Sequence, residues 1–207
     1  MSRIKKVGVY GGTFSPPHIG HVSSARAFID QEELDELIII PTYLPPHKEC
    51  EKSATPMQRL EMCRLSFSHI KGVSVSDMEI ERKGKSYTYL TLSELINERN
   101  DIRPVFLCGT DMILTFDEWY RFEDIFKMAD IVYIRREKDE LIAKQIKTKT
   151  QEYIEKYNAS VRELKTEPIN ISSTELREMI SKNQDTSTYL NKETEEYIKK
   201  WNIYQKK

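Results

Sequence analysis

Two histidines near the N-terminus carry the clearest chemical signature of the chain. His18 and His21 are three residues apart, so both side chains lie on one face of the first turn of an expected helix. Gly11 and Gly12 precede this helix, directly after an expected strand, and let the backbone approach a ligand closely. The free N–H groups and positive dipole end of the helix start suit a phosphate. Two imidazoles there can also stabilise charge that develops in a transition state, so the segment predicts a phosphate-binding loop.

Other kinds of site fit this loop less well. The chain lacks GxxxxGK[ST], which excludes a Walker-type loop, and lacks GxGxxG after this strand, which leaves a dinucleotide fingerprint unsupported. His18, His21 and His47 can in principle supply three metal ligands with an open fourth position. The electropositive start of a helix disfavours a cation at that place. A tight turn followed by an exposed helix end is the purely structural alternative.

Two further segments carry residues that suit an anion and a flat ring. His47 and Lys48 follow two prolines, so a stiff turn presents cations to an anion, unless it is simply an exposed basic turn. Asp111 follows an expected strand as part of Gly109-Thr110-Asp111, where a carboxylate can accept hydrogen bonds from ribose hydroxyls. Trp119 lies eight residues later and can stack on a flat ring or belong to the core.

A fourth segment begins an expected helix near the C-terminal end. It consists of Ser172, Ser173 and Thr174, followed by Arg177 one turn further on. The hydroxyls can cap the helix, which is the better interpretation of this segment taken alone, or hold phosphate oxygens. The planar guanidinium of Arg177 can reach the same anion.

The elements that must position these residues alternate along the chain. Apolar-rich strands are expected at 7–10, 37–40, 105–107 and 130–134, and alternating residues at 73–80 and 161–164 indicate two more extended segments. Helices are expected from about 17, from the capping signal at 55–58, at 88–99, 122–128 and 141–157, and from 173 and 191. This order predicts an α/β fold with a doubly wound, mostly parallel sheet and helices on both faces. Ligands then bind beyond the carboxyl ends of the strands.

Composition narrows the class of protein and its partners. The chain has 207 residues, with 32 Lys and Arg against 33 Asp and Glu and a net charge of −1. This balance argues against a nucleic-acid partner and a polybasic membrane anchor. The three cysteines show no CxxC spacing, and no signal peptide or membrane span is evident, so a cytoplasmic protein is expected. Residues 1–207 are expected to form one domain with 178–207 as a C-terminal helical extension, and a homo-oligomer is left open.

Four motifs occur together and in order over about residues 6–177. They are GGTFSPPHIGH, PPHK, SYT with GxD and a later Trp, and ISSTELR. This combination resembles the bacterial nicotinate-nucleotide adenylyltransferases within the HxGH nucleotidyltransferase superfamily. The resemblance implies a Rossmann-like nucleotidyltransferase fold and transfer of AMP from ATP to nicotinate mononucleotide, giving nicotinate adenine dinucleotide and pyrophosphate. It also implies Mg²⁺, expected through the ATP phosphates and not through protein side chains.

The resemblance assigns roles to the residues that match its motifs. The histidines, His18 and His21, would be catalytic and handle the ATP phosphates. The other ATP-binding residues would be Gly12, Thr13, Phe14, Gly109, Asp111, Ser172, Ser173, Thr174 and Arg177. The pyridine pocket and the phosphate-facing loop of the acceptor site would comprise Tyr87, Thr88, Trp119, His47 and Lys48.

The sequence departs from the family pattern at a few positions and is compatible with other functions. The family usually has an acidic residue at Ser15, an aliphatic one at Pro17, and Arg-Pro-Gly where Arg135, Arg136 and Glu137 follow the expected strand. Nicotinamide mononucleotide or another phosphate-bearing compound is an alternative acceptor. A non-catalytic nucleotide sensor and a metal-dependent hydrolase are alternatives from other classes, although a sensor would not need both histidines.

Overall fold

A single parallel sheet runs through the centre of the molecule. The structure, a computed structural model, describes residues 3–44, 54–135, 139–166, 169 and 171–205. The strands within these ranges are β1 (Lys5–Gly12), β2 (Glu36–Pro41), β3 (Val73–Val75), β4 (Ile102–Gly109), β5 (Asp130–Ile134) and β6 (Val161–Leu164). Their order is β3-β2-β1-β4-β5-β6, and every neighbouring pair is parallel. The strand order therefore reverses between β1 and β4, as in a doubly wound Rossmann-like sheet.

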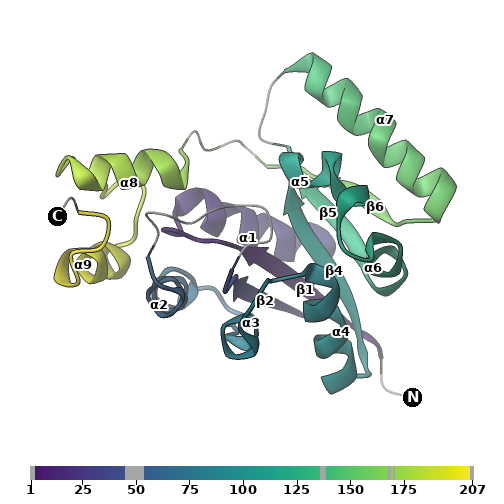
Figure 1. The fold of residues 1–207 in the computed structure, drawn as a ribbon, viewed down its shortest axis with the longest axis horizontal. Coiled ribbons are helices and arrows are strands. Elements are labelled where there is room, and N and C mark those ends of the chain that lie inside the picture. Colours follow the sequence, from purple (N-terminus) through teal and green to yellow (C-terminus); the bar gives the residue numbers. More distant parts are fainter. Residues whose placement is uncertain (1–2, 45–53, 136–138, 167–168, 170, 206–207) are drawn as a thin grey trace.

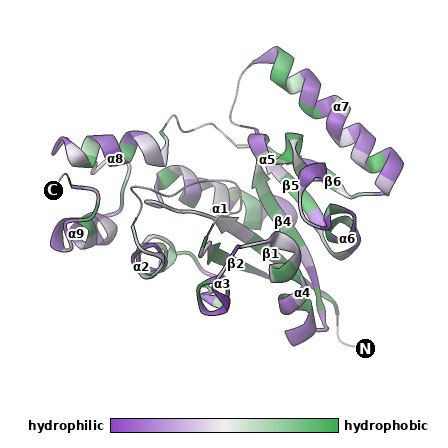
Figure 2. Cartoon of the chain, viewed as in Figure 1, coloured by the Kyte–Doolittle hydropathy of each residue, from purple (hydrophilic) through white to green (hydrophobic). Residues whose placement is uncertain are grey.

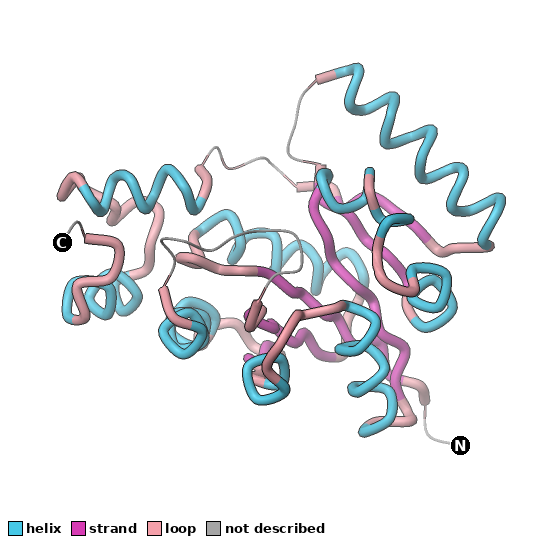
Figure 3. The backbone as a smooth tube through the Cα atoms, in the orientation of Figure 1, coloured by secondary structure: helices cyan, strands magenta, loops and turns pink. Residues whose placement is uncertain are grey.

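Helices follow most of the strands, which Figure 1 shows along the colour gradient. They are α1 (Ile19–Glu32), α2 (Pro56–Phe67), α3 (Met78–Arg82), α4 (Thr88–Glu98), α5 (Thr110–Leu114), α6 (Phe122–Met128), α7 (Glu140–Tyr157), α8 (Ser173–Ser181) and α9 (Lys192–Lys200). A short 3₁₀ turn, η1 (Phe116–Glu118), links α5 to α6. Figure 3 shows how loops join these helices to the strand ends.

Each face of the sheet has its own core. Val7 and Val9 of β1 pack on one face with side chains from α4, α5, α6 and α7. Tyr10 points to the other face, where it packs with α1 and α2. The two faces arise because successive side chains of a strand point in opposite directions. The predicted doubly wound architecture is confirmed.

A smaller apolar cluster joins the C-terminal helices to α2. Met62 of α2, Leu176 of α8 and Ile198 of α9 are all buried in it. Figure 1 shows α8 and α9 together at one end of the molecule. Figure 2 shows hydrophilic turns interrupted by hydrophobic residues along α7, whose buried side chains are Ile146 and Tyr153. No helix within the described ranges is long and apolar enough to cross a membrane.

Sequence patterns placed most element starts correctly and one segment wrongly. Thr55 caps α2 through the predicted capping box with Gln58, since each side chain accepts the other's backbone N–H. The extended segment expected at 73–80 is wrong beyond Val75, because the strand pairing with β2 ends there and α3 begins three residues later, at Met78. Asp77 starts this turn, because its carbonyl accepts the N–H of Ile80 at 2.8 Å. Neither α5 nor η1 was expected.

Candidate active site

A cavity of about 180 Å³ opens at the carboxyl ends of β1, β2 and β4. Six of the predicted site residues line it together: Gly12, Thr13, Tyr87, Thr88, Asp111 and Trp119. These residues come from three segments: the end of β1, the start of α4, and the stretch from α5 to the end of η1 that follows β4. Such segments meet because parallel strands end at the same edge of the sheet. The cavity is smaller than the roughly 300–1,000 Å³ that encloses a drug-sized ligand. It therefore suits one ring of a ligand whose remainder extends outside.

Aromatic side chains give this cavity its shape. Trp119 stacks on Phe116 with ring centroids 4.6 Å apart and an interplanar angle of 16°. Phe106 of β4 meets Trp119 edge-on at 6.1 Å. Tyr87 and Tyr120 lie 5.1 Å apart on the cavity wall. Trp119 thus satisfies both sequence interpretations, because it packs against the core and also lines the cavity.

The two histidines form a reciprocal cap at the start of α1. His18 Nδ1 accepts the N–H of Gly20 at 3.1 Å, and His21 Nδ1 accepts the N–H of His18 at 3.2 Å. Their ring centroids are 3.8 Å apart. Because Nδ1 is an acceptor in both rings, the proton of each neutral imidazole lies on Nε2. Each ring can therefore donate from Nε2 to a phosphate oxygen without carrying a positive charge.

The helix start differs from the sequence expectation in one respect. The N–H groups of its first turn are not free: Ile19 donates to the carbonyl of Tyr189 at 2.9 Å, and His21 donates to the carbonyl of His18 at 2.8 Å. The N–H of Gly20 is bound by the His18 ring. The cap satisfies these donors inside the protein, so imidazole nitrogens replace backbone N–H groups as the donors to a phosphate. A metal could reach these rings only at Nε2.

Phe14 occupies an unusual backbone position in the glycine-led loop. Its φ is +48°, in the left-handed region that non-glycine residues seldom adopt. The side chain is only 2% exposed and packs edge-on against Tyr10 at 5.4 Å and His21 at 5.1 Å. A Cβ on Gly12 would come within 3.0 Å of the Phe14 ring. The loop thus folds back on itself, and any nucleotide contact of Phe14 has to come from its backbone.

Gly109 and Asp111 lie together at the end of β4. A Cβ on Gly109 would come within 2.9 Å of Asp111 Oδ1, so glycine lets the carboxylate fold back over the strand end. Thr110 anchors the turn by donating to the carbonyl of Ile134 at 3.1 Å. Asp111 itself is exposed and lines the cavity.

The start of α8 packs on the first loop. Ser172 caps the helix in a capping box with Glu175, which matches the structural interpretation of this segment. Ser173 Oγ donates to the carbonyl of Pro16 at 2.9 Å. Arg177 donates to the carbonyl of Ser15 at 2.8 Å and to Thr174 Oγ1 at 3.0 Å. The segment is therefore brought to the histidine loop, as predicted, with its side chains engaged in protein contacts.

The C-terminal extension reaches the same loop, which no sequence pattern indicated. Tyr204 Oη lies 3.0 Å from Ser15 Oγ, and burial raises the pKa of Tyr204, so its phenol remains protonated. The Tyr189 carbonyl binds Ile19 at the start of α1. Residues beyond 178 thus support the loop that carries both histidines.

Arg59 is a second residue that sequence reasoning missed. It is only 2% exposed and donates to three carbonyls: Thr13 at 2.9 Å, Tyr43 at 3.1 Å and Ala54 at 3.3 Å. These carbonyls belong to the loops after β1 and β2 and to the residue before the α2 cap. A guanidinium has several donors in a rigid fork, which suits this task. An Arg one turn into a helix gave no signal, because such residues are usually exposed.

Several predicted residues lie outside the described ranges. They are His47 and Lys48 of the PPHK loop and Arg136 after β5. Among the residues that are described, no group of three His, Cys, Asp or Glu side chains is placed to hold a metal ion.

Comparisons with known proteins agree with the fold and the motifs. The family model of the cytidylyltransferase-like proteins matches residues 9–179. A Clostridium botulinum protein described as a probable nicotinate-nucleotide adenylyltransferase is 35% identical over 205 residues, covering 97% of this chain and 98% of its own. One from Listeria monocytogenes with the same description is 32% identical and covers 98% of both chains. The chain belongs to the bacterial nicotinate-nucleotide adenylyltransferases of the cytidylyltransferase-like family.

Solved structures of this kind share the fold at lower identity. The nicotinic acid mononucleotide adenylyltransferase of Plasmodium falciparum complexed with NaAD matches with a TM-score of 0.75 and 19% identity. The match covers 97% of both chains. A nicotinate-nucleotide adenylyltransferase structure from Vibrio parahaemolyticus, described as putative, matches with a TM-score of 0.67 and 18% identity. The doubly wound sheet of this family is thus common to the chain and to these neighbours.

Proposed function

We propose that the protein transfers the adenylyl group of ATP to nicotinate mononucleotide, releasing pyrophosphate and forming nicotinate adenine dinucleotide. The observation that carries this proposal is the position of the aromatic cavity beside the histidine loop. Gly12 and Thr13 line the cavity, and the same loop continues to His18 and His21. A ring bound against Trp119 would leave its ribose and phosphate to extend toward that loop. Family membership supports the same reaction.

The reaction needs no protein base. The nucleophile is a 5′-phosphate oxygen of the acceptor, largely ionised at neutral pH because its second pKa is about 6. This oxygen bonds to the α-phosphorus of ATP. The bond from that phosphorus to the bridging oxygen breaks, and pyrophosphate leaves with the electron pair. The protein's task is to hold the two phosphates in line and to stabilise the developing charge.

Nε2 donors of His18 and His21 would supply that stabilisation. The reciprocal cap fixes both rings, so the donors are oriented before ATP arrives and need no rearrangement during the reaction. ATP would enter as its magnesium complex, in which the ion neutralises phosphate charge.

The remaining residues would divide between the two substrates. On the ATP side, Gly109 and Asp111 would bind the adenosine ribose. Gly12, Thr13 and the backbone of Phe14 would lie against the reacting nucleotides. The start of α8 would face adenine and phosphates through Ser172, Ser173, Thr174 and Arg177. On the acceptor side, Tyr87, Thr88 and Trp119 would enclose the pyridine ring, and His47 and Lys48 would contact its phosphate.

Residues 1–207 would act as one nucleotidyltransferase domain. The extension at 178–207 would keep the histidine loop in place, a role supported by the contact between Ser15 and Tyr204.

The decisive experiment measures pyrophosphate release with ATP, Mg²⁺ and each acceptor in turn. We expect release with nicotinate mononucleotide and a product with the mass of nicotinate adenine dinucleotide. Release only with nicotinamide mononucleotide or another phosphate ester would identify a different acceptor. ATP binding without any turnover would favour a nucleotide sensor, and phosphate or AMP release without an acceptor would favour a hydrolase.

A further inference from the structure

A buried phenol on α7 binds the segment that joins α5 to η1. Tyr153 belongs to α7, which packs against α5. Its hydroxyl lies 3.2 Å from the carbonyl oxygen of Ile113 and 3.0 Å from Asp117 Oδ1, two acceptors that share its proton. The same hydroxyl accepts the backbone N–H of Asp117 at 3.3 Å. A single side chain therefore ties the end of α5 and the middle of η1 to one point.

Residues 113–117, here called the α5–η1 junction, contain a break in helical structure. The helix α5 ends at Leu114, and η1 begins at Phe116. Thr115 lies between them with a φ of −118° and a ψ of 19°, away from helical values. The ends of elements are positions where a chain bends most easily. The Tyr153 hydroxyl bridges this break from a helix of 18 residues.

A second side chain of α7 holds the same junction. Lys149, one turn before Tyr153, donates to Asp117 Oδ2 at 2.7 Å. Burial raises the pKa of Asp117, but hydrogen bonds from Lys149 and Tyr153 lower it by more, so the carboxylate is charged and accepts both. Burial also raises the pKa of the Tyr153 phenol, which therefore keeps the proton that it donates.

The two sides of the junction lead to different parts of the proposed site. Asp111, two residues before Ile113, lines the cavity and is assigned to the ATP ribose. Trp119, two residues after Asp117, also lines the cavity and is assigned to the pyridine ring. Tyr153 has no exposed surface, so it can affect a ligand only through this segment. Because the reaction requires both substrates at a fixed spacing, the shape of the junction matters to both.

We propose that the Tyr153 hydroxyl is a positioning group for adenylyl transfer: it holds the α5–η1 junction in the conformation that binds ATP through Asp111 and the mononucleotide through Trp119. This inference rests on the proposed function. Without the hydroxyl, the junction also occupies conformations that bind neither substrate well. The first substrate to bind then has to restore the binding conformation, and the second finds it already formed. Loss of the hydroxyl thus creates cooperativity between the two substrates.

The test measures this cooperativity by calorimetry on Tyr153→Phe, which keeps the buried ring and removes only the hydroxyl. The probes are nicotinate mononucleotide and the magnesium complex of an ATP analogue in which a methylene group between the α- and β-phosphorus atoms prevents transfer. We expect each probe alone to bind about 2- to 10-fold more weakly than to the wild type, the range of one hydrogen bond. With the other probe saturating, each affinity should return to near its wild-type value. The kcat with both substrates saturating should also stay near the wild-type value.

Two further variants make this test specific to the junction. Tyr157→Phe is the matched control, because Tyr157 lies one turn further along α7 and packs on Phe122 of α6 with ring centroids 5.2 Å apart. It should change neither affinity. Asp117→Ala loosens the junction from its other side, at a partly exposed position. It removes Oδ1 and the pair with Lys149, so it should show the same cooperativity even where Tyr153→Phe does not fold.

Amide hydrogen exchange adds a readout that needs no nucleotide. Exchange at residues 113–119 should be faster in Tyr153→Phe than in the wild type, and exchange in α1 should be unchanged.

Three results would overturn the inference. They are unchanged exchange at 113–119, unchanged affinities for the single probes, and weakened affinities that the second probe does not restore. A loss of thermal stability with unchanged single-probe affinities would show that the hydroxyl serves the core alone. If the wild type binds neither probe, the proposed function is contradicted instead, and exchange at 113–119 still decides whether the hydroxyl fixes the junction.

Discussion

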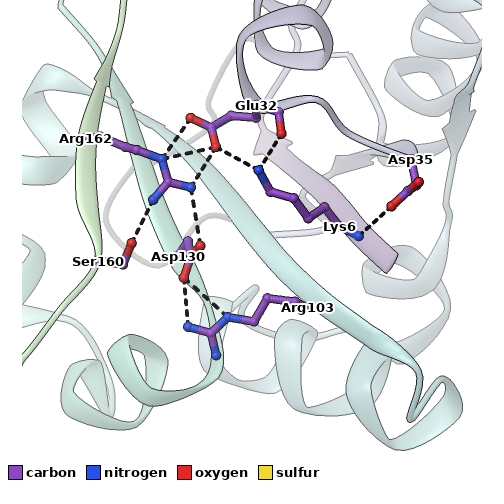
Figure 4. Close-up of polar contacts among 7 residues, drawn as sticks. All are labelled: Lys6, Glu32, Asp35, Arg103, Asp130, Ser160 and Arg162. Carbon is purple, nitrogen blue, oxygen red and sulfur yellow. Dashed lines mark hydrogen bonds and ion pairs between the residues drawn. The ribbon is translucent and has the colours of Figure 1, made fainter. Parts of the chain in front are cut away.

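Glu32 and Glu79 are both buried carboxyls, at opposite edges of the parallel sheet. At the amino edge, Arg162 of β6 donates to the Glu32 carboxylate of α1 from Nε at 2.9 Å and from Nη2 at 2.6 Å (Figure 4). Lys6 lies 3.6 Å from the same carboxylate. At the carboxyl edge, Glu79 Oε1 accepts a hydrogen bond from Thr91 at 2.6 Å and lies 3.9 Å from Arg82, while Oε2 is buried at the cavity wall with no hydrogen bond of good geometry among the described residues.

The amino-edge network continues from strand to strand. Figure 4 shows Asp130 between two guanidiniums, with Arg103 at 2.7 Å and Arg162 at 3.3 Å. These groups come from the starts of β4, β5 and β6 and satisfy one another. The comparison shows two uses of charged side chains. At the strand starts, charged groups that all have partners of opposite charge hold the strands together. At the strand ends, polar groups with fewer hydrogen-bond partners are available to a ligand.

Removing His21 should produce the largest effect and confine it to the carboxyl edge. We expect His21→Ala to lower kcat about 10²-fold or more, the scale of losing one donor to a transition state. Loss of its capping acceptor should lower the free energy of unfolding by only about 1 kcal/mol. Steady-state kinetics and urea unfolding measure the two effects. His69→Ala, at an exposed position, is the control, and a near-normal kcat in His21→Ala would refute the catalytic assignment.

Removing Arg162 should lower stability and leave kcat unchanged, which is the opposite of the effect expected for His21. Arg162→Met leaves the Glu32 carboxylate buried with one fewer partner, so we expect the free energy of unfolding to fall by about 2 kcal/mol. This is less than for a fully buried pair, because the Arg162 side chain is 37% exposed. The kcat should remain unchanged.

Two companion variants test whether the loss comes from the unpaired carboxylate. The added change Glu32→Gln should recover part of the lost stability. Lys192→Met, in an exposed pair with Glu196, should change stability by less than about 0.5 kcal/mol. Equal losses in Arg162→Met and Lys192→Met would show that the amino-edge network contributes no more than a surface ion pair.

Changing Trp119 should affect acceptor binding selectively. We expect Trp119→Ala to raise KM for the mononucleotide by about 2- to 10-fold, the worth of one aromatic contact, and Trp119→Phe to raise it less. KM for ATP should stay the same. Because Trp119 also stacks on Phe116, thermal unfolding must be measured alongside. A rise in KM for ATP alone would place Trp119 in the adenine site.

The pH dependence of stability should have opposite signs at the two edges. Burial raises the pKa of Asp130, but the hydrogen bonds and charges of Arg103 and Arg162 lower it by more. The net result is a pKa below the ordinary value of an aspartate. The contribution of Asp130 to the free energy of unfolding is therefore present above its unfolded-state pKa, and it is lost as the pH falls through its folded-state pKa. Burial raises the pKa of Glu79, which gives the reverse, a contribution present below its unfolded-state pKa and lost as the pH rises through the folded one.

Unfolding free energies of Asp130→Asn and Glu79→Gln across pH check these signs. Asp130→Asn should lose stability at neutral pH and match the wild type more closely in acid. The difference should be about 1 kcal/mol or less, because Asp130 is partly exposed. The wild type should lose some unfolding free energy as the pH rises through the pKa of Glu79, and Glu79→Gln should not show this loss. Parallel curves for both variants and the wild type would contradict the comparison.

Local patterns in the sequence predicted the sheet and the loops of the site. Apolar runs placed the strands, and capping residues placed helix starts, as Asn191 shows by accepting the N–H of Thr194 at 3.1 Å. The motif loops also meet at one edge, as the doubly wound order requires. The extended segment beyond Val75 was misjudged because Asp77 and its neighbours turn into a short helix where the strand loses its partner.

Other features could not be predicted because their causes are distant in sequence. Arg59 gathers carbonyls from two loops, and Tyr204 meets Ser15 across 189 positions of the chain. Such contacts depend on how the elements pack and leave no periodic trace.

The amino-acid sequence by itself determined the fold class, the family motifs and the edge of the sheet that carries the site. These follow from short-range order: apolar periodicity, capping residues and motif spacing. Only the tertiary structure decided that the two histidines cap their own helix, that Phe14 turns into the core and that Glu79 lies buried beside the ring cavity. Burial and hydrogen-bond partners set the tautomer, charge and availability of a side chain, and these come from residues brought together by folding.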